Sequence, residues 1–477
     1  MDRTNPATGE SLEPVPDDSE ADVEAALDRA AETFEEWKGA SIQKRQQLLA
    51  AAGDVLRENA DEYAELMTEE MGKPIDAAVA EAEKCAWVCD YYAENAAEHL
   101  QDDHHAGDPH VETYVSYEPL GPILAVMPWN FPFWQVFRFA APHLTAGNVG
   151  LLKHASNVPG CAEAIQEVFE EAGYPEGVFQ SLIVGSDEID SIIEDDRVKA
   201  VTLTGSARAG RSVGSAAGEN LKKSVLELGG SDPFVVLDDA DLDSAAETGA
   251  RARTINSGQS CIAAKRFVVH TEIYDEFLGK FRDEMEALTV GDPTDEETDV
   301  GPQAREDLME DLHEQVQQTV DAGATLELGG EPLDGESAGN PSIDSGGFYY
   351  PPTILTDVPR DSAAACEEVF GPVAAVFEVE DEAEAVEVAN DVHLGLGASV
   401  WTDDLERGKR VAHRFEAGCT FVNELVKSDP RLPFGGVKDS GYGRELAEHG
   451  IEEFVNKKTV WVQEADANEE SVGIGVE

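Results

Sequence analysis

The chain has 477 residues, 42% of them hydrophobic, which is enough for more than one hydrophobic core, so we expect a multi-domain protein. It carries 34 Lys and Arg residues against 98 Asp and Glu residues, and this formal net charge of −64 excludes nucleic acid as a partner. The acidic residues are spread along the chain. Self-repulsion of that size predicts a cytoplasm of very high ionic strength, as in an extreme halophile.

The compartment follows from the apolar segments and the cysteines. No run of about eighteen apolar residues occurs, and residues 1–6 lack the basic and apolar segments of a secretory signal, so we expect a cytoplasmic protein without a membrane span. The six Cys residues are scattered, which argues against a disulfide framework. Cys85 and Cys89 lie one helical turn apart with no further ligands nearby, and they are predicted to be buried structural thiols.

The first hundred residues are predicted to be helical. Ser19-Glu20-Ala21-Asp22 has the pattern of a capping box, and apolar residues follow it at helical spacing. Further amphipathic helices are expected at residues 46–56 and 77–93.

From Gly121 onwards, short apolar runs alternate with helices. In a first alternation, strands are expected at residues 123–126, 149–153, 180–184, 200–204 and 234–236, with helices beginning near residues 159, 187 and 206. In a second, strands are expected at residues 266–270, 325–328, 374–377, 397–401 and 420–423, with helices at 274–288, 304–322, 382–390 and 405–415. Continuous apolar strands that alternate with helices predict two α/β domains with mainly parallel, buried sheets.

Two strand-like pieces, residues 111–117 and 456–462, belong to neither alternation. Edge-like segments of this kind often pair with another subunit, although the pattern alone is equally consistent with a surface hairpin. Residues 464–477 are acidic and contain glycine, and we predict a disordered end.

One thiol and one carboxylate carry the first chemical signal. Asn256-Ser257-Gly258-Gln259-Ser260-Cys261 places Cys261 in a predicted turn, and Glu227 stands at a predicted strand end before Gly229-Gly230. A thiolate can attack an aldehyde, and a carboxylate can activate water to hydrolyse the resulting thioester. Each residue alone is more often a packing or turn residue, so the pair is what suggests a nucleophile and a base.

Two segments after predicted strands add to this signal. Asn130, within Pro128-Trp129-Asn130-Phe131-Pro132, could donate a hydrogen bond to a developing oxyanion. The segment from Gly205 to Gly210 opens a helix whose free N–H groups could hold a pyrophosphate, but it lacks the Gly-x-Gly-x-x-Gly pattern and is weak evidence alone.

These segments, together with residues 368–372 and 433–438, resemble in order and spacing the aldehyde dehydrogenase superfamily over essentially the whole chain except its C-terminal end. The resemblance implies an α/β fold with a five-stranded Rossmann-like cofactor-binding domain, an α/β catalytic domain and a small oligomerisation β-hairpin, assembled into dimers or tetramers. We place the NAD(P)-binding domain at residues 1–100 and 120–228 and the catalytic domain at 229–440. Residues 101–119 and 455–463 are the expected oligomerisation strands.

The resemblance also implies residue roles. Cys261 matches the nucleophile, Glu227 the general base, and Asn130 the amide that binds the oxyanion together with the Cys261 N–H group. The cofactor is NAD or NADP, without a metal, and the matching cofactor-binding residues are Trp129, Lys153, Ser156, Gly205, Ser206, Gly210, Glu368 and Phe370. Members that transfer the acyl group to coenzyme A lack the carboxylate, so Glu227 favours hydrolysis to the free acid.

The sequence departs from the family pattern at a few positions. Ser156 replaces a Glu that repels the 2′-phosphate in NAD-specific members, and Arg208 replaces an acidic residue; NADP is therefore at least tolerated, while NAD could still be preferred. Phe139 stands where many members have a lysine linked to a proton relay that ends at Glu445. Ser231 stands where lysine is usual.

Arg138 and Ser428 indicate the substrate. They match residues of succinate-semialdehyde dehydrogenases that bind the distal carboxylate, and bidentate guanidinium recognition suits that task. Succinic semialdehyde is the leading substrate; Arg138 could instead form a structural ion pair. The alternatives are another short aldehyde, such as 2-oxoglutarate semialdehyde, glyceraldehyde or an aliphatic aldehyde, or a binding protein that lost the chemistry. Nearby aromatic residues could wall a substrate channel or belong to the core: Trp129, Phe133, Trp134, Phe137 and Phe434.

Overall fold

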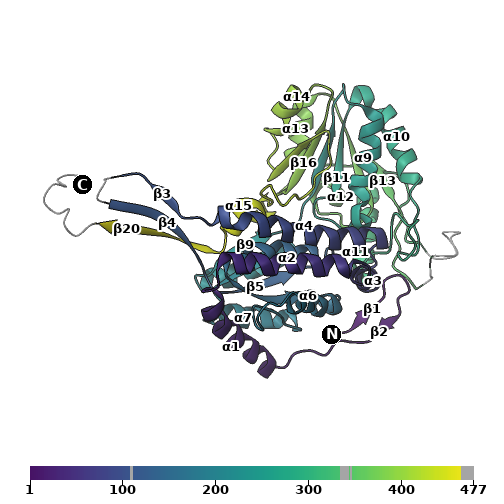
Figure 1. The fold of residues 1–477 in the computed structure, drawn as a ribbon. Coiled ribbons are helices and arrows are strands. Elements are labelled where there is room, and N and C mark those ends of the chain that lie inside the picture. The colour runs from purple at the N-terminus through teal and green to yellow at the C-terminus, as the bar shows by residue number, and fades with distance from the viewer. Residues whose placement is uncertain (108–110, 334–342, 344–345, 464–477) are drawn as a thin grey trace.

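The computed structural model describes residues 1–107, 111–333, 343 and 346–463. Two large sheets covered by helices form two adjoining bodies, and a three-stranded sheet projects from one of them (Figure 1). No helix in the described part of the chain is long and apolar enough to cross a bilayer.

The six-stranded sheet has the order β19-β9-β8-β5-β6-β7. Five neighbouring strands are parallel and β19 is antiparallel at the edge. The five-stranded sheet that the resemblance implies is therefore extended by a short strand from far along the chain. The strands are β5 (Pro122–Met127), β6 (Val149–His154), β7 (Phe179–Ser181), β8 (Ala200–Thr204), β9 (Lys223–Glu227) and β19 (Gly441–Tyr442).

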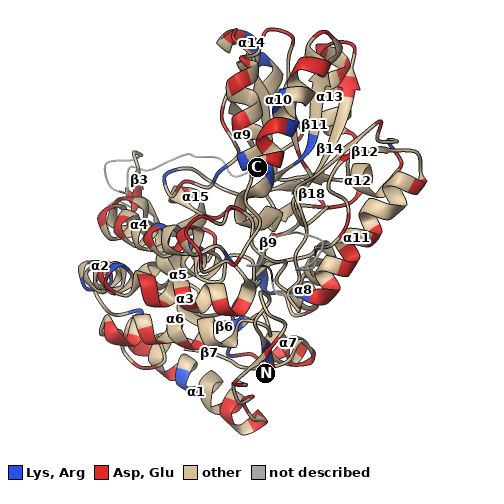
Figure 2. Cartoon of the chain, turned by 90° about the vertical axis from the view of Figure 1, so that its right-hand side faces the viewer, with Lys and Arg blue, Asp and Glu red and all other residues tan. Residues whose placement is uncertain are grey.

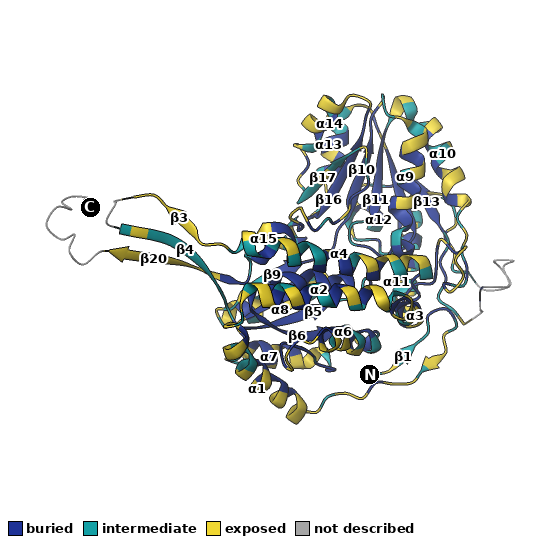
Figure 3. Ribbon diagram, in the orientation of Figure 1, coloured by how far each residue is buried: buried dark blue, intermediate teal, exposed yellow. Residues whose placement is uncertain are grey.

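Helices cover both faces of this sheet, which explains why its central strands are buried on both sides (Figure 3). The Ser19 capping box is confirmed, since Ser19 and Asp22 cap each other at the start of α1. Cys85 and Cys89 are fully buried in α4, as predicted. The helices are α1 (Glu20–Trp37), α2 (Ile42–Glu58), α3 (Ala60–Met71), α4 (Ile75–His99), α5 (Trp134–Ala146), α6 (Pro159–Glu171), α7 (Ile189–Glu194) and α8 (Ala207–Glu219).

The seven-stranded sheet has the order β12-β13-β14-β11-β10-β16-β17, and only its edge strand β12 is antiparallel to its neighbour. The strands are β10 (Asp232–Val236), β11 (Ala264–His270), β12 (Thr325–Leu328), β13 (Thr353–Thr356), β14 (Val373–Val379), β16 (Gly397–Trp401) and β17 (Cys419–Val422). The helices are α9 (Leu242–Thr254), α10 (Tyr274–Glu286), α11 (Glu306–Asp321), α12 (Ala363–Cys366), α13 (Glu382–Asn390) and α14 (Leu405–Ala412).

Some strand predictions need correction. Residues 234–236 were expected in the first alternation, but β10 pairs with β11 and β16 in the middle of the second sheet. Strand β7 ends at Ser181, so residues 182–184 lie outside it. Strand β13 was not predicted; two prolines precede it, and proline is disfavoured inside strands.

The projecting sheet has the order β20-β4-β3. Its strands are β3 (Asp103–His105), β4 (Val111–Pro119) and β20 (Val455–Gln463), and β4 pairs with β20 antiparallel along its whole length, from Val111↔Gln463 to Pro119↔Val455. The two pieces that stood outside both alternations thus form one sheet. Trp461 is 63% exposed on its β20 edge.

Short elements complete the chain: β1 (Arg3–Thr4), β2 (Ser11–Leu12), β15 (Leu394–Gly395), β18 (Val437–Lys438), α15 (Ala447–Ile451) and the 3-10 helices η1 (Ser186–Glu188), η2 (Ile255–Gly258) and η3 (Thr271–Ile273). Acidic residues lie on the helices of both bodies (Figure 2), so the negative charge is spread over the surface as the sequence predicts. The predicted tail at residues 464–477 lies outside the described residues.

Candidate active site

Cys261 lies in a turn between η2 and β11, as predicted. The backbone before it is left-handed at three successive residues, with φ of 55° at Asn256, 55° at Ser257 and 76° at Gly258. A Cβ on Gly258 would come 2.2 Å from the carbonyl carbon of Gly371, so this position requires glycine. Left-handed non-glycine residues cost free energy and persist where surrounding contacts impose them, often at active sites.

Buried side chains impose this conformation. Arg253 Nη2 donates to the Gly258 carbonyl at 2.8 Å, and Asn256 Nδ2 donates to the Asn130 carbonyl at 2.7 Å. Lys265 Nζ donates to the carbonyls of Ser260 and Cys261, each at 2.7 Å. The turn therefore holds the thiol in one place, as a nucleophile requires.

The surroundings of the Cys261 thiol favour its protonated form at neutral pH. Burial raises its pKa to about 12, although the charges of Lys265 and Arg138 act in the opposite direction. A proton acceptor must therefore remove the thiol proton before attack.

Asn130 lies directly beside this turn. Its Nδ2 donates to the Gln259 carbonyl at 3.0 Å, and the residue is 4% exposed. An amide nitrogen carries two N–H groups, so one remains to donate to another oxygen near Cys261. This arrangement is the one expected of an oxyanion-binding amide.

Glu81 on α4 holds the segment between Asn130 and α5. Its Oε1 accepts hydrogen bonds from the N–H groups of Phe133 and Trp134, both at 2.9 Å, and it forms a buried ion pair with Lys73. Free N–H groups at a helix start need such an acceptor. Glu81 thus fixes where α5 begins and hence where Asn130 and Arg138 lie.

Glu227 is the last residue of β9 and is 2% exposed. Neither carboxylate oxygen has a hydrogen-bond partner among the described residues. Burial and the nearby Glu445 carboxylate raise its pKa well above the usual value, while the charges of Arg138 and Arg444 lower it. A buried carboxyl group without partners, at a strand end, is a candidate for general acid–base chemistry.

Arg138 forms an ion pair with Glu445 in the interior and donates from Nη2 to Thr204 Oγ1 at 3.3 Å. Thr204 is the register partner of Glu227 across β8 and β9, so Arg138 reaches the strand end that carries the candidate base. Its guanidinium also lies over the Phe434 ring, 4.8 Å from the centroid. Phe139, in contrast, packs in the core against the His143 ring. The positive charge beside Glu445 is therefore that of Arg138, and not of a lysine at position 139 as in many family members.

Ser428 accepts a hydrogen bond from Lys84 Nζ at 2.8 Å. Lys84 lies on α4 with its ammonium group 4.2 Å from the centroid of the Trp134 ring. Burial and the neighbouring Arg138 charge lower the pKa of Lys84 to about 8. Lys84 was not among the residues predicted to belong to the site. It could have been found from the sequence as a lysine on the same face of α4 as Glu81, Cys85 and Val88.

Glu368 marks the candidate nicotinamide end of the cofactor site. Its Oε1 accepts from the Gly230 N–H group at 3.0 Å and lies 3.6 Å from Lys265 Nζ. A Cβ on Gly229 would meet Glu368 Oε2 at 2.3 Å, so the glycine makes room for the carboxylate. Phe370 packs edge-on against Trp129, with ring centroids 5.7 Å apart. Lys265, which sequence reasoning missed, thus joins Glu368 to the Cys261 turn.

The candidate adenosine end lies at the carboxyl edge of the six-stranded sheet. Lys153, near the end of β6, is 7% exposed and forms no hydrogen bond or ion pair with a described residue. Ser206 caps α8, accepting from the Ala209 N–H group, and Gly205 precedes it. A mainly apolar groove of about 330 Å³ is lined by Gly210, Leu226, Leu228 and Tyr442. The Lys153 ammonium group, the N–H groups at the start of α8 and the apolar groove together fit a dinucleotide cofactor.

Ser156 and Arg208 bear on the choice of cofactor. Ser156 is exposed beside Lys153 and lines a cavity of about 630 Å³ with Asn157 and Arg305. Arg208 is exposed on α8 and forms no ion pair with a described residue. No carboxylate of residues 153–156 or 205–210 opposes a phosphate here.

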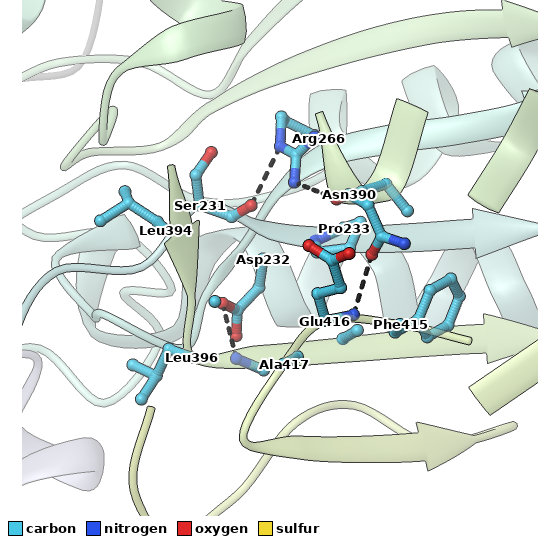
Figure 4. Close-up of a pocket in the computed structure, with 14 residues that line it drawn as sticks. Ser231, Asp232, Pro233, Arg266, Asn390, Leu394, Leu396, Phe415, Glu416 and Ala417 are labelled. Carbon is cyan, nitrogen blue, oxygen red and sulfur yellow. Dashed lines mark hydrogen bonds between the residues drawn. The ribbon is translucent and has the colours of Figure 1, made fainter. Parts of the chain in front are cut away.

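A separate small cavity is lined by Ser231, Asp232 and Arg266 on one side and by Leu394 and Glu416 on another (Figure 4). Its volume of about 10 Å³ leaves room for a single water molecule. Ser231 Oγ and Asp232 Oδ2, which have no partner among the described residues, could share that water, while Arg266 Nε donates to the Ser231 carbonyl at 3.0 Å. The cavity that Figure 4 shows is too small for a substrate.

The aromatic residues divide into two groups. Phe133 and Phe137 are fully buried and stacked on each other, so they belong to the core rather than to a channel wall. Trp129, Trp134 and Phe434 instead contact Phe370, Lys84 and Arg138. Across the described residues, no group of three or more His, Cys, Asp and Glu side chains could hold a metal ion.

The sequence profile described as "Aldehyde dehydrogenase family" matches residues 1–460. The chain belongs to the aldehyde dehydrogenase family. Its α/β fold is confirmed by solved members of that family: the crystal structure of succinic semialdehyde dehydrogenase from Streptococcus pyogenes in complex with NADP+ superposes with a TM-score of 0.93 at 38% identity, over 97% of this chain and 100% of that one.

Two sequence relatives are more similar still. A probable succinate-semialdehyde dehydrogenase [NADP(+)] from Synechocystis is 52% identical over 96% of this chain and 98% of its own length. Succinate-semialdehyde dehydrogenase [NADP(+)] from Mycobacterium avium is 50% identical over 99% of both. The predicted family is therefore correct, and this aldehyde dehydrogenase resembles members named for one substrate.

Proposed function

We propose that this aldehyde dehydrogenase oxidises succinic semialdehyde to succinate with NADP. The observation that carries the chemistry is the Cys261 turn, which is held beside the Asn130 amide while Glu227 stands buried and without partners at the end of β9. The relatives named succinate-semialdehyde dehydrogenase, about half identical over nearly the whole chain, support the substrate.

In the proposed reaction, the Cys261 thiol gives its proton to Glu227, which passes it to solvent, and the sulfur attacks the aldehyde carbon. Asn130 and the Cys261 N–H group donate to the oxygen that becomes negative. NADP, when bound, supplies the hydride acceptor for the oxidation. The acyl group then remains on sulfur, and Glu227 takes a proton from the water that releases succinate.

We propose that residues 1–100 and 120–228 bind the cofactor and that residues 229–440 carry the nucleophile. Lys153 would hold the adenosine ribose, Gly205, Ser206 and Gly210 the pyrophosphate, and Glu368 the nicotinamide ribose, with Trp129 and Phe370 beside it. Neither Ser156 nor Arg208 brings a carboxylate to the 2′-phosphate of NADP, and the relatives that carry NADP(+) in their names support that cofactor.

We propose that Arg138 and Ser428 bind the distal carboxylate of the substrate. Arg138 already pairs with Glu445, but a guanidinium carries five N–H donors and can serve both groups. The structural ion pair and the substrate contact are therefore compatible.

The activity is tested by measuring NADP and NAD reduction in molar KCl with succinic semialdehyde and with butanal. We expect succinic semialdehyde and NADP to give the highest kcat/KM, and Cys261→Ala to abolish turnover. If butanal reacts as well as the semialdehyde, the substrate assignment is wrong. If no aldehyde is oxidised, the activity itself is wrong.

We further propose that the protein works as a dimer or tetramer in a cytoplasm of high ionic strength. The projecting sheet carries exposed Trp461 and Val462 on its β20 edge, and a second copy would cover them. Light scattering in molar KCl should give a multiple of the 51.4 kDa chain, whereas a monomer would contradict this assembly.

A further inference from the structure

A second cation, the half-buried Lys84, lies near Arg138. Trp134 and Arg138 are four residues apart on α5 and so lie on one face of that helix. The Lys84 ammonium lies over the Trp134 ring at 4.2 Å and donates to Ser428 Oγ at 2.8 Å. Lys84, Arg138 and Ser428 thus gather from three separate parts of the chain.

The charges in this group do not balance. Arg138 is paired with Glu445, but Lys84 forms no ion pair with a described residue, although the chain has 98 acidic residues. Burial and the Arg138 charge lower the pKa of Lys84 by more than the nearby Glu81 and Asp429 carboxylates raise it. Two neighbouring like charges away from bulk water, of which only Arg138 has an ion-pair partner among the described residues, are stabilised by a further anion.

Lys84 also has donors to spare. An ammonium group has three N–H donors, and Ser428 Oγ is its one hydrogen-bond acceptor among the described residues. The aromatic ring of Trp134 takes another side of the group. At least one Lys84 donor therefore remains for a ligand.

We propose that Lys84 is a specificity-determining residue that binds the distal carboxylate of a short ω-carboxylate aldehyde together with Arg138 and Ser428. This inference rests on the proposed function, because it assumes that the substrate carries a carboxylate. The proposal adds a second positive charge to the site and explains why a lysine on α4 is half-buried without an ion-pair partner among the described residues.

The test compares Lys84→Met with Lys38→Met. Both changes remove a lysine that lies over an aromatic ring and keep much of the side-chain volume, but Lys38 lies over Phe34 on the surface, with its side chain 42% exposed. In Lys84→Met, we expect the KM for succinic semialdehyde to rise by about 10- to 100-fold, with kcat within about twofold. The kcat/KM for butanal should stay within about twofold, and Lys38→Met should change neither substrate.

Rescue separates charge from packing. Lys84→Arg keeps the positive charge and should hold the KM for the semialdehyde within about threefold of the wild type. An Arg variant as poor as Lys84→Met overturns the inference, and so does an equal loss for both aldehydes in Lys84→Met. If Lys84→Met does not fold, Lys84→Gln, which keeps a donor to Ser428, takes its place with the same expectations.

The two proposals fail in different ways. If the wild type prefers succinic semialdehyde over butanal but Lys84→Met leaves the KM unchanged, only the role of Lys84 is wrong. If the wild type shows no preference, the substrate assignment is wrong and the role of Lys84 falls with it.

Discussion

Arg138 and Glu445 form an ion pair in the interior of the protein, with side chains 2% and 4% exposed. Arg138 also donates to Thr204, the register partner of Glu227, so the pair lies next to the candidate base. The arginine that we propose for substrate binding therefore also neutralises a buried carboxylate. Removing it must affect stability as well as specificity.

We predict that Arg138→Met destabilises the protein by about 3–5 kcal/mol, because Glu445 is left buried without a cation. The double variant Arg138→Met/Glu445→Gln should recover most of that loss. Urea unfolding in molar KCl at pH 8 measures both. Arg57→Met, which breaks the exposed pair with Asp90, is the control and should cost less than about 1 kcal/mol. If the single and double variants lose the same free energy of unfolding, the ion pair does not contribute to stability.

We predict that Glu227→Gln is inactive yet more stable than the wild type. The folded pKa of Glu227 is raised, so the folded protein binds this proton more tightly than the unfolded chain does. Its contribution to stability is therefore lost as pH rises from the unfolded pKa to the folded pKa, by up to about 1.4 kcal/mol per pH unit. Thermal melts from pH 5 to pH 8 should show a gain for Glu227→Gln that grows with pH. A constant or shrinking gain contradicts the raised pKa.

We predict that alkylation of Cys261 in the protein without cofactor becomes about tenfold faster per pH unit between pH 7 and pH 10. Burial raises the thiol pKa to about 12, so only a small thiolate fraction is present throughout this range, and it grows in proportion to hydroxide. Iodoacetamide labelling, followed at the Cys261 peptide by mass spectrometry, gives the rates. A plateau between pH 8 and pH 9 would instead indicate a thiol activated in the free enzyme.

We predict that Ser156→Glu raises the KM for NADP by about tenfold or more and leaves the KM for NAD within about threefold. A carboxylate at this exposed position, close to Lys153, would repel the 2′-phosphate, which NAD lacks. Steady-state kinetics with both cofactors decide it, and Ser156→Gln, of similar size but neutral, is the matched control. If Glu and Gln weaken NADP binding equally, size rather than charge is responsible.

The sequence predicted the parts of this structure that local patterns determine. Strands β8, β12 and β16 and helix α13 have the predicted bounds, since each is an apolar run or amphipathic stretch with clear ends. Strand β10 was assigned to the wrong sheet, because the chain passes from one sheet to the next within a few residues after Glu227 and no local pattern marks the change.

In the candidate site too, local features could be predicted from the sequence, and contacts between distant residues could not. The turn that holds Cys261 could be expected from its polar, glycine-containing sequence, but its support by Lys265 and Arg253 could not. The pairing of Arg138 with Glu445 and the contact of Lys84 with Ser428 join residues hundreds of positions apart. Such contacts depend on the packing of α4, α5 and the C-terminal segment.

The net charge of −64 leads to the last prediction, which concerns salt. Acidic residues lie on helices of both bodies, so their repulsion acts over many residues; it is screened over about 3 Å in molar salt but over about 10 Å at 0.1 M. We expect the melting temperature to fall by more than about 10 °C when KCl is lowered from 2 M to 0.1 M, with loss of activity on prolonged incubation. Sucrose at matched viscosity is the control, since it adds no ions. A melting temperature independent of KCl would mean that the charge is balanced within the fold and that high ionic strength is not required.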